Sequence, residues 1–392
     1  MTHSTDPVPG TDNEAKLLEW LDTMRNEQPV WRDSYGMWHV FRHADVLAIT
    51  RDTDTFSSNT GRLVPAADPA KTGMLTQLDP PEHRQLRNVL SAAFTPRRVA
   101  NLEPRIRELS REMLDHAGER FDFVDALAFP LPVTVIAELL GLPVADHDRF
   151  RDWADGLFSM QVDDPTDPDL DKRVSTAFGE ISVYLTDVVR SRRATPGDDL
   201  VSALVTAEVD GYRLDDEEAA NMAALLLLAG HVTTTLLLGS TIRTFDDHPG
   251  TWAELNSDPG LIPGAVEEVL RLRPPFTRFG RVTTGPVDIS GVTVPADSLV
   301  LPWLLSANQD SRAFTDPERF DIRRSAGGGS QLAFGHGVHF CLGAPLARLE
   351  ARVAIEEMTA RFAAVEVDGT DLRPYTRGIL GTRQLPVHVT SH

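Results

Sequence analysis

Apolar side chains recur every three or four positions along most of the chain, the spacing of a helix that buries one face. Near the N-terminus this stripe runs through Leu17, Leu21 and Met24. In "DPPEHRQLR", Asp79 is a candidate N-cap with Glu82 three residues on, so a helix is expected to start there. The same spacing predicts helices over Leu102–His116, Pro132–Leu140, Asp148–Phe158, Val174–Arg193, Asp215–Phe245, Leu261–Arg271 and Ala344–Phe362.

Only short segments alternate between apolar and polar residues, which is the pattern of a half-buried strand. They lie at Tyr35–Phe41, Val287–Val294, Leu299–Leu301 and Leu385–Val389. The pattern predicts a mainly α fold with small β-sheets rather than a doubly wound α/β fold. Because no linker, composition shift or repeat divides the chain, we expect a single domain over residues 14–392. The polar residues 1–13 are expected to be a disordered N-terminus.

The formal net charge of −20, from 38 basic and 58 acidic residues, argues against nucleic acid as a partner, because such binding needs a basic surface. The single cysteine excludes an intrachain disulfide, and the N-terminus lacks the basic and apolar segments of a secretory signal. The apolar stretch Leu225–Leu238 is interrupted by polar residues and too short to cross a bilayer. We therefore expect a cytoplasmic protein that binds no membrane.

That apolar stretch, "LLLLAGHVTTTLLLG", contains residues in its middle that lower the stability of a helix. A glycine inside a helix costs roughly 1 kcal/mol relative to alanine, and threonine is a poor helix former. Two interpretations stay open: the interruption is a chemical site, or the threonine hydroxyls only bond helix carbonyls.

Cys341 lies in the glycine-rich segment "FGHGVHFCLG", directly before a predicted helix. The glycines allow a tight turn around the sulfur, and a helix start favours a thiolate. The cysteine is either an inert buried residue or a thiolate ligand of haem iron. A zinc site with His336 and His339 lacks a fourth ligand at a suitable spacing.

The segment Phe334–Gly343 closely resembles the haem-ligand signature of the cytochrome P-450 superfamily, Phe-x-x-Gly-x-x-x-Cys-x-Gly. The resemblance extends over residues 14–390, and it implies a cytochrome P-450 fold that holds heme b (haem b). The haem would be buried between the Asp215–Phe245 helix and the helix after Cys341. It also implies that Cys341 ligates the iron and that Phe334, Gly335 and Gly343 surround it.

Other segments match the same family in the expected order. Glu268 and Arg271 in "AVEEVLRLRPP" resemble its Glu-x-x-Arg pair, and Arg319 in "DPERFD" would be the third, structural partner. The resemblance further implies that four cationic side chains bind the two haem propionates: His83, Arg87, Arg281 and His339.

The interrupted helix resembles the family's oxygen-binding helix, Ala/Gly-Gly-x-Asp/Glu-Thr-Thr/Ser. By that resemblance Ala229 and Gly230 make room for dioxygen, while Thr233 and Thr234 serve catalysis and proton delivery. Val232 stands where the family has a carboxylate, which puts the usual proton relay in doubt. Replacement waters could be organised by His231, by the threonines or by a substrate hydroxyl.

Further stretches, among them "FPLPVTVIAELLGLP" and "LGTRQLPV", resemble a bacterial branch that hydroxylates macrolides and related polyketides in antibiotic biosynthesis. This implies hydroxylation or epoxidation of a macrolide or other polyketide; a tetramic acid or another natural product is the alternative. Two roles stay open for Asp163 and Asp164: they belong to a solvated acidic loop, or they contact the amino sugar of a macrolide. The pocket is expected to contain Met74, Leu75, Met160, Leu227, Val232, Phe276 and Leu380.

The implied reaction uses O2 and electrons from a ferredoxin and its NAD(P)H-dependent ferredoxin reductase. Arg348 and Arg352, with Arg97 and Arg98, are candidates for docking an acidic ferredoxin, and a monomer is expected. Val232 keeps open a haem-binding sensor that does not oxygenate. The third hypothesis is a protein without haem, in which the cysteine loop has only a structural role.

Overall fold

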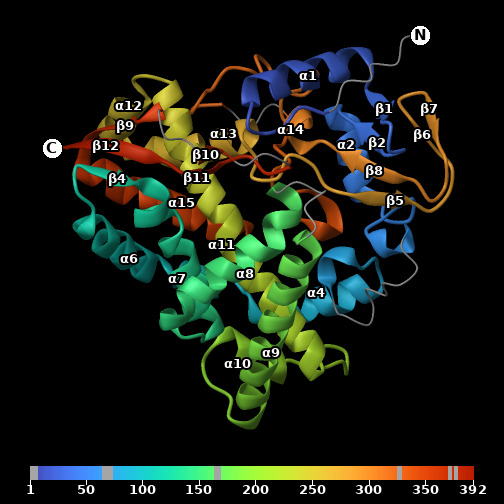
Figure 1. Ribbon diagram of the computed structural model, residues 1–392, viewed down its shortest axis with the longest axis horizontal. Helices are drawn as coiled ribbons and strands as arrows, with labels where there is room; N and C mark the ends of the chain where they lie inside the picture. The colour runs from blue at the N-terminus through green and yellow to red at the C-terminus, as the bar shows by residue number, and fades with distance from the viewer. Residues whose placement is uncertain (1–7, 64–73, 163–168, 325–328, 370–372, 375–377) are drawn as a thin grey trace.

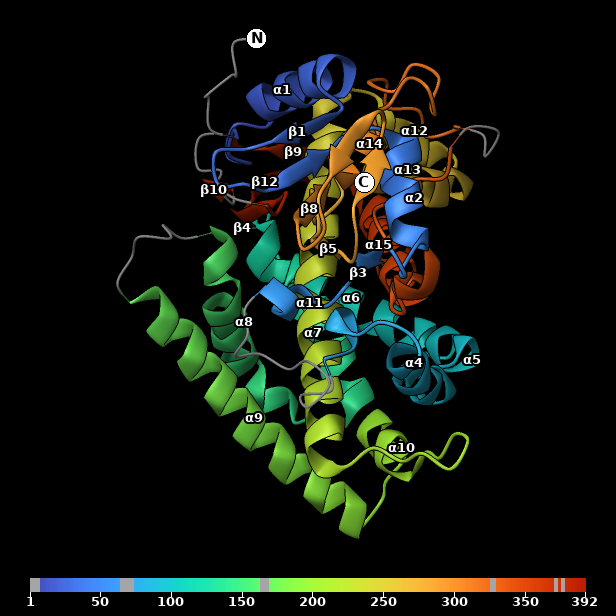
Figure 2. The same ribbon diagram turned by 90° about the vertical axis from the view of Figure 1, so that its right-hand side faces the viewer.

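A single long helix, α11 (Asp216–Asp247), runs through the middle of the molecule, and the other elements pack around it (Figures 1 and 2). The computed structural model describes residues 8–63, 74–162, 169–324, 329–369, 373–374 and 378–392. α11 begins with a capping box, in which Asp215 accepts from the Glu218 backbone N–H and Glu218 accepts from that of Asp215. The helix is therefore defined from its first turn.

Helices from the middle of the chain cover one end of α11, with α8 and α9 packed side by side. α7 and α9 lie directly against α11, and most apolar side chains of this region join the largest core cluster. The elements are α4 (Glu82–Ala93), α5 (Pro96–Ala100), α6 (Glu103–His116), a π-helix (Val124–Ala128), α7 (Pro130–Leu140), α8 (His147–Val162), α9 (Leu170–Ala194) and α10 (Leu200–Thr206).

The helix that follows Cys341, α15 (Ala344–Arg361), packs on α11 from another side. It also contacts α12 (Thr251–Ser257) and α13 (Ile262–Leu272). Ion pairs tie it to α6: Arg107 lies 2.6 Å from Glu356, and Arg352 lies 2.6 Å from Glu103. A network of this kind holds better than isolated surface pairs, so α15 is fixed between α6 and α11.

The remaining elements form a β-rich part with α1 (Glu14–Glu27), α2 (His43–Arg51) and α14 (Leu304–Ala307). Its five-stranded sheet has the order β1–β2–β8–β5–β3, and only β2 and β8 pair in parallel. The strands are β1 (Val30–Arg32), β2 (Trp38–Val40), β3 (Phe56–Ser57), β5 (Arg281–Thr283) and β8 (Leu299–Pro302).

Three smaller sheets complete the described structure. β12 pairs with both β4 and β9, β6 pairs with β7, and β10 pairs with β11. These strands are β4 (Arg120–Asp122), β6 (Val287–Ile289), β7 (Val292–Val294), β9 (Phe362–Val367), β10 (Arg373–Pro374), β11 (Thr382–Gln384) and β12 (Pro386–Ser391). Short 3-10 turns lie at Thr60–Leu63, Leu75–Gln77, Val144–Asp146, Pro259–Leu261 and Gly337–His339.

The expected fold class, mainly α with small sheets, is confirmed, while two local expectations are wrong. Val287–Val294 is a hairpin, β6 and β7, because Ser290 and Gly291 take positive φ and reverse the chain. Asp79 does not cap α4: Pro81 occupies the N-cap, and the Asp79 carboxylate instead accepts from the Ser57 hydroxyl and from the Ser58 backbone N–H. The single domain over residues 14–392 stays a prediction.

Two further expectations concern the N-terminus and α11. Residues 1–7 lie outside the described part, whereas Val8 packs on an apolar cluster and Thr11 is buried. Within the described ranges one helix, α11, is long and apolar enough to cross a membrane, although half of its most apolar window is buried in the protein. The apolar stretch Leu225–Leu238 is therefore only part of a longer helix, because α11 continues to Asp247.

Candidate functional site

A cavity of about 300 Å³, here called the haem cavity, separates α11 from the loop that carries Cys341. α11 contributes to its wall Leu225, Leu226, Ala229, Gly230, Thr233, Thr234 and Leu237, a set that recurs with helical spacing. α4 contributes His83 and Arg87, and α15 contributes Leu346. The lining is therefore apolar on most sides, with the sulfur and a few cationic groups at its edges.

The backbone holds Cys341 in place. Its N–H donates to the carbonyl of Phe334 at 2.9 Å, which closes the loop into a hairpin-like turn. Gly335 and Gly337 adopt φ values of 69° and 73°, as the turn requires, and a Cβ on Gly337 would lie 2.5 Å from the Thr50 carbonyl oxygen. Gly343 is different: it has negative φ and forms the N-cap of α15.

Burial raises the pKa of the Cys341 thiol, although the backbone N–H groups of Gly343 and Ala344 and the guanidinium groups of Arg87 and Arg348 oppose this. The helix start alone therefore does not produce the expected thiolate. A bound metal ion would supply the missing positive charge, since a coordinating thiol is deprotonated outright. Across the described ranges no three His, Cys, Asp or Glu side chains gather as a metal site.

Cationic side chains meet at one edge of the haem cavity. The rings of His83 and His339 lie 4.1 Å apart, and His339 Nε2 lies 2.8 Å from the Ser58 hydroxyl. The Arg87 guanidinium donates to the Phe340 carbonyl at 2.6 Å. Arg281 is buried beside the two histidines.

The pKa values of this cluster show that it lacks negative charge. Burial, with the nearby arginines, lowers the pKa of His83 to about 4 and that of His339 to about 3. Burial lowers the pKa of Arg281 to about 10. His83 Nε2 is also buried without a hydrogen-bond partner in the described structure. A dianionic group would satisfy these side chains, so the thiol, the apolar cavity and the cationic edge fit a haem with two propionates.

The three threonines of α11 bond to the backbone of their own helix. The hydroxyls of Thr233, Thr234 and Thr235 donate to the carbonyls four residues earlier, at 2.7, 3.1 and 2.9 Å. Thr233 and Thr234 also line the haem cavity. Both interpretations of the interruption therefore apply, since a hydroxyl that donates to a carbonyl keeps lone pairs for a water in the cavity.

Gly230 serves the packing of α11 as well as the cavity. A Cβ at this position would lie 3.0 Å from Ile136 Cγ1 on α7. Ala229 lines the cavity one residue earlier. The small pair thus leaves room above the cysteine, but the glycine is also required by the neighbouring helix.

Val232, which was expected in the substrate pocket, is not among the residues that line the haem cavity. It packs with Phe276, Leu236 and Ile379 in a small apolar cluster. Phe276 lines the haem cavity, whereas Val232 and Ile379 line a second cavity on the other side of α11. No carboxylate from α11 itself therefore stands between the two cavities.

Glu350 is a site residue that the sequence analysis missed. It is fully buried on α15 beside the Thr234 hydroxyl, and burial raises its pKa to about 8, so the carboxyl is mostly protonated at neutral pH. Neither carboxyl oxygen has a partner in the resolved hydrogen-bond network. The signal was present in the sequence, because Glu350 falls four residues after Leu346 on the buried stripe of α15.

The expected pair of Glu268 and Arg271 is present, but its third partner was wrongly assigned. Two nitrogens of Arg271 lie 2.8 Å from the Glu268 carboxylate. Arg324, not Arg319, completes the group, with Nε 2.8 Å from Glu268 Oε1. Arg319 offers its backbone carbonyl to Arg271 and Arg324, because its side chain is exposed on the preceding turn.

Two residues expected in the substrate pocket lie elsewhere. Leu227 belongs to the main core, because its position turns it away from the cavity-lining face of α11. Leu380 packs with the N-terminal core, and its neighbour Ile379 is the one that faces Val232.

The other pocket residues are placed as follows. Leu75 and Phe276 line the haem cavity, while Met74 is half-buried directly before the short helix that carries Leu75. The side chain of Met160 and the residues Asp163 and Asp164 lie outside the described part of the chain.

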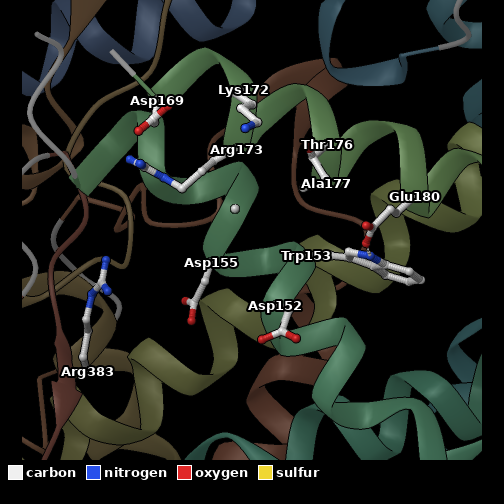
Figure 3. Close-up of a pocket in the computed structure, with 11 residues that line it drawn as sticks. Asp152, Trp153, Asp155, Asp169, Lys172, Arg173, Thr176, Ala177, Glu180 and Arg383 are labelled. Carbon is white, nitrogen blue, oxygen red and sulfur yellow. Dashed lines mark hydrogen bonds between the residues drawn. The ribbon is translucent and has the colours of Figure 1, made fainter. Parts of the chain in front are cut away.

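A large open cleft of about 760 Å³, lined by residues of α8 and α9 and by Arg383, was not expected from the sequence (Figure 3). We call it the α8–α9 cleft. Acidic and basic side chains alternate along its walls and are shown in Figure 3: Asp152, Asp155, Asp169, Glu180, Lys172, Arg173 and Arg383. It lies next to the second cavity, because Asp155 and Arg383 line both.

Three of the four arginines expected to dock a ferredoxin are engaged within the protein. Arg348 bonds to Glu267, and Arg352 bonds to Glu103 and Glu356. Arg97 on α5 is exposed, whereas Arg98 bonds to the Ala93 carbonyl. The cysteine loop itself exposes two large apolar side chains, Val338 and Phe340.

Comparisons with known proteins agree over nearly the whole chain. Residues 260–390 match the family described as cytochrome P450. The erythromycin C-12 hydroxylase of Saccharopolyspora erythraea is 58% identical over 384 residues, covering 97% of this chain and 96% of that protein. The cyclomarin C epoxidase CymV of Salinispora arenicola is 45% identical, covering 99% of this chain and 100% of that protein. The open structure of cytochrome P450 EryK from S. erythraea superposes with a TM-score of 0.94 at 58% identity, covering 98% of each chain.

Proposed function

Because this chain belongs to the cytochrome P450 family, we propose that it hydroxylates or epoxidises a macrolide or another polyketide in antibiotic biosynthesis. The chain is a haem-thiolate monooxygenase, and the class of its substrate is what we propose here. The observation that carries the function is the meeting of Cys341 and the cationic edge at one apolar cavity beside α11.

In this assignment Cys341 Sγ would ligate the iron of haem b, and His83, Arg87, Arg281 and His339 would hold its propionates. The haem, when bound, activates O2 with electrons supplied by a ferredoxin and its NAD(P)H-dependent reductase. Phe334, Gly335 and Gly343 shape the loop around the sulfur. The structural group of Glu268, Arg271 and Arg324 fixes the segment that precedes it.

The chain's own catalytic contribution lies on α11. Thr233 Oγ1 donates to Ala229 and so presents its lone pairs to the haem cavity, where it can hold a water and pass on a proton. Thr234 stands between the cavity and the protonated Glu350. Ala229 and Gly230 leave the space for O2, and Leu75 and Phe276 present apolar surface to the substrate.

The proposal extends to the partners and the location of the protein. Val338 and Phe340 on the cysteine loop offer exposed apolar surface, and Arg97 on α5 an exposed basic group, for an acidic ferredoxin. We propose a cytoplasmic monomer that binds neither membrane nor nucleic acid, which is supported by the charge of −20.

The reduced protein with bound carbon monoxide tests the haem-thiolate assignment. Its spectrum should contain the red-shifted thiolate band, and Cys341→His should abolish that band because imidazole replaces the thiolate. His336→Ala, a change in the same loop beside Arg51, should retain it. A wild-type spectrum without the band would exclude the assignment.

Difference spectra on titration with macrolides, other polyketides and a tetramic acid test the substrate class. A macrolide or related polyketide should displace water near the iron and shift the spectrum at micromolar concentration. Binding of only the tetramic acid would favour the alternative substrate. Val232 favours a second candidate, a haem-binding sensor, and single-turnover product analysis separates it from the monooxygenase because a sensor yields no oxygenated product.

A further inference from the structure

The second cavity, of about 100 Å³, lies behind α11 and is here called the rear cavity. Successive helix residues are turned by about 100°, so His231, Val232 and Thr235 face it while Ala229, Gly230 and Thr233 face the haem cavity. Its far wall includes Asp155 of α8 and Arg383 of β11. The cavity is large enough for about three waters at roughly 30 Å³ each.

His231, one of the residues that line the rear cavity, carries an unpaired acceptor. Its Nδ1 lies 2.7 Å from the Leu227 carbonyl oxygen, which only accepts, so Nδ1 carries the hydrogen and Nε2 carries a lone pair. The side chain is fully buried, and Nε2 has no partner within the described chain. Burial lowers the pKa of His231 to about 4, which keeps the ring neutral. An unpaired buried acceptor costs roughly 1–3 kcal/mol, and a water relieves that cost.

The rear cavity shares lining residues with the α8–α9 cleft, and one of its residues packs near the haem cavity. Asp155 and Arg383 line both the rear cavity and the α8–α9 cleft, and Figure 3 shows them at the cleft wall. On the other side, Val232 packs in the same apolar cluster as Phe276, which lines the haem cavity. The rear cavity therefore lies between the cleft and the position on α11 where Val232 stands.

We propose that water in the rear cavity, held by His231 Nε2 and the Asp155 carboxylate, supplies the protons that a carboxylate at position 232 would otherwise deliver. This rests on the proposed function. Insertion of one oxygen atom consumes the substrate C–H, one O2, two electrons from the ferredoxin and two protons, and yields the alcohol and one water. The two protons pass from the cavity water to the oxygen atom that leaves as water, and the α8–α9 cleft replaces them.

Asp155→Asn and His231→Phe test the two groups that hold the water. Each should lower product formed per NAD(P)H consumed by at least threefold and raise the solvent isotope effect on product formation, because protons arrive more slowly. Asp152→Asn is the matched control, since Asp152 lies on the same helix and lines the cleft but not the rear cavity. Unchanged coupling in Asp155→Asn and His231→Phe would overturn the proposal.

A rescue variant separates proton supply from a structural role. Val232→Glu in the Asp155→Asn background places a carboxylate back on α11 and should restore coupling to within about twofold of wild type. A structural defect at Asp155 would not respond to a change on another helix. Failure of the rescue, with normal folding, therefore counts against the proposal.

Deuterium exchange of the histidine C2 proton, measured by mass spectrometry on the haem-loaded protein, tests the cavity water without turnover. His39 is the internal reference: it is equally buried, burial lowers its pKa to about 4, and both ring nitrogens are bonded, to Asp33 and Trp303. His231 should exchange at least threefold faster than His39. Ala154→Leu should abolish the difference, because Ala154 lines the rear cavity and a larger side chain fills it.

The two measurements fail separately. Equal exchange at His231 and His39 overturns the water-filled cavity even if a polyketide is oxygenated. Absence of any oxygenated product, with fast exchange at His231, overturns the proposed function while the cavity water stands.

Discussion

Arg319 and Arg324 lie in the same turn region, but only one of their side chains reaches Glu268. The side chain of Arg319 is exposed, whereas that of Arg324 bonds to the Glu268 carboxylate. Glu268 is buried, and its charge is balanced by Arg271 and by Arg324, whose side chain is about 19% exposed. Arg324 also donates to the carbonyls of Thr315, Asp316 and Arg319. One side chain therefore satisfies a buried carboxylate and several carbonyls of the segment before the cysteine loop.

Arg324→Ala should lower the free energy of unfolding by about 2–3 kcal/mol, because it leaves part of a buried carboxylate and several carbonyls unpaired. Arg319→Ala should change it by less than about 0.5 kcal/mol, since that side chain is exposed. Urea unfolding followed by tryptophan fluorescence measures both. A larger loss in Arg319→Ala would restore Arg319 as the third partner of Glu268.

At the scale of the element, α11 combines a packing surface with a reaction surface. The carbonyls of Leu227, Ala229, Gly230 and His231 each accept a side-chain hydrogen bond from four residues later. Such bonds weaken a helix locally, and packing against α7, α9 and α15 compensates. The interruption is therefore tolerated because α11 is held on several sides.

Glycine-to-alanine substitutions in two helices measure how tightly α11 is held. Gly179→Ala on α9 should raise the free energy of unfolding by about 0.5–1 kcal/mol, because alanine favours a helix and its Cβ would meet nothing within 4 Å. Gly230→Ala should gain nothing or lose up to about 1 kcal/mol, because Ile136 must move. Urea unfolding of the haem-loaded protein compares them, and equal gains would show that α7 yields freely.

At the scale of the whole molecule, α15 and α11 together create a buried acid between them. Glu350 has a pKa of 4.5 when unperturbed, and burial raises it to about 8 in the folded protein. Between these values the folded chain holds a proton that the unfolded chain releases. Stability contributed by the protonated group is thus complete below pH 4.5 and is lost as the pH rises through about 8.

Glu350→Gln should remove that loss. Wild type should lose on the order of 2–4 kcal/mol of unfolding free energy between pH 5 and 8 relative to this variant, since an amide does not titrate. Urea unfolding at pH 5, 6.5 and 8 gives the comparison. The exposed Glu318→Gln is the control and should follow wild type, whereas parallel curves for wild type and Glu350→Gln would contradict the buried-acid assignment.

Much of the site was readable in the sequence because its chemistry depends on local spacing. Cys341, its glycines and the following helix form one continuous segment, so the loop around the sulfur is fixed by residues close in the chain. Glu268 and Arg271 are three residues apart on a helix and must share a face. In the same way, the small and polar residues that interrupt the apolar stretch of α11 indicated which part of the helix lines the cavity.

Tertiary structure decided what depends on segments far apart in the chain. Spacing could not choose Arg324 over Arg319, turn Leu227 and Leu380 into the core, or place Ile136 against Gly230. It also could not bring Asp155 and Arg383 to a cavity behind Val232. A sequence determines which face of an element is apolar, whereas the partner of that face, and the cavities left between partners, arise only when the elements pack.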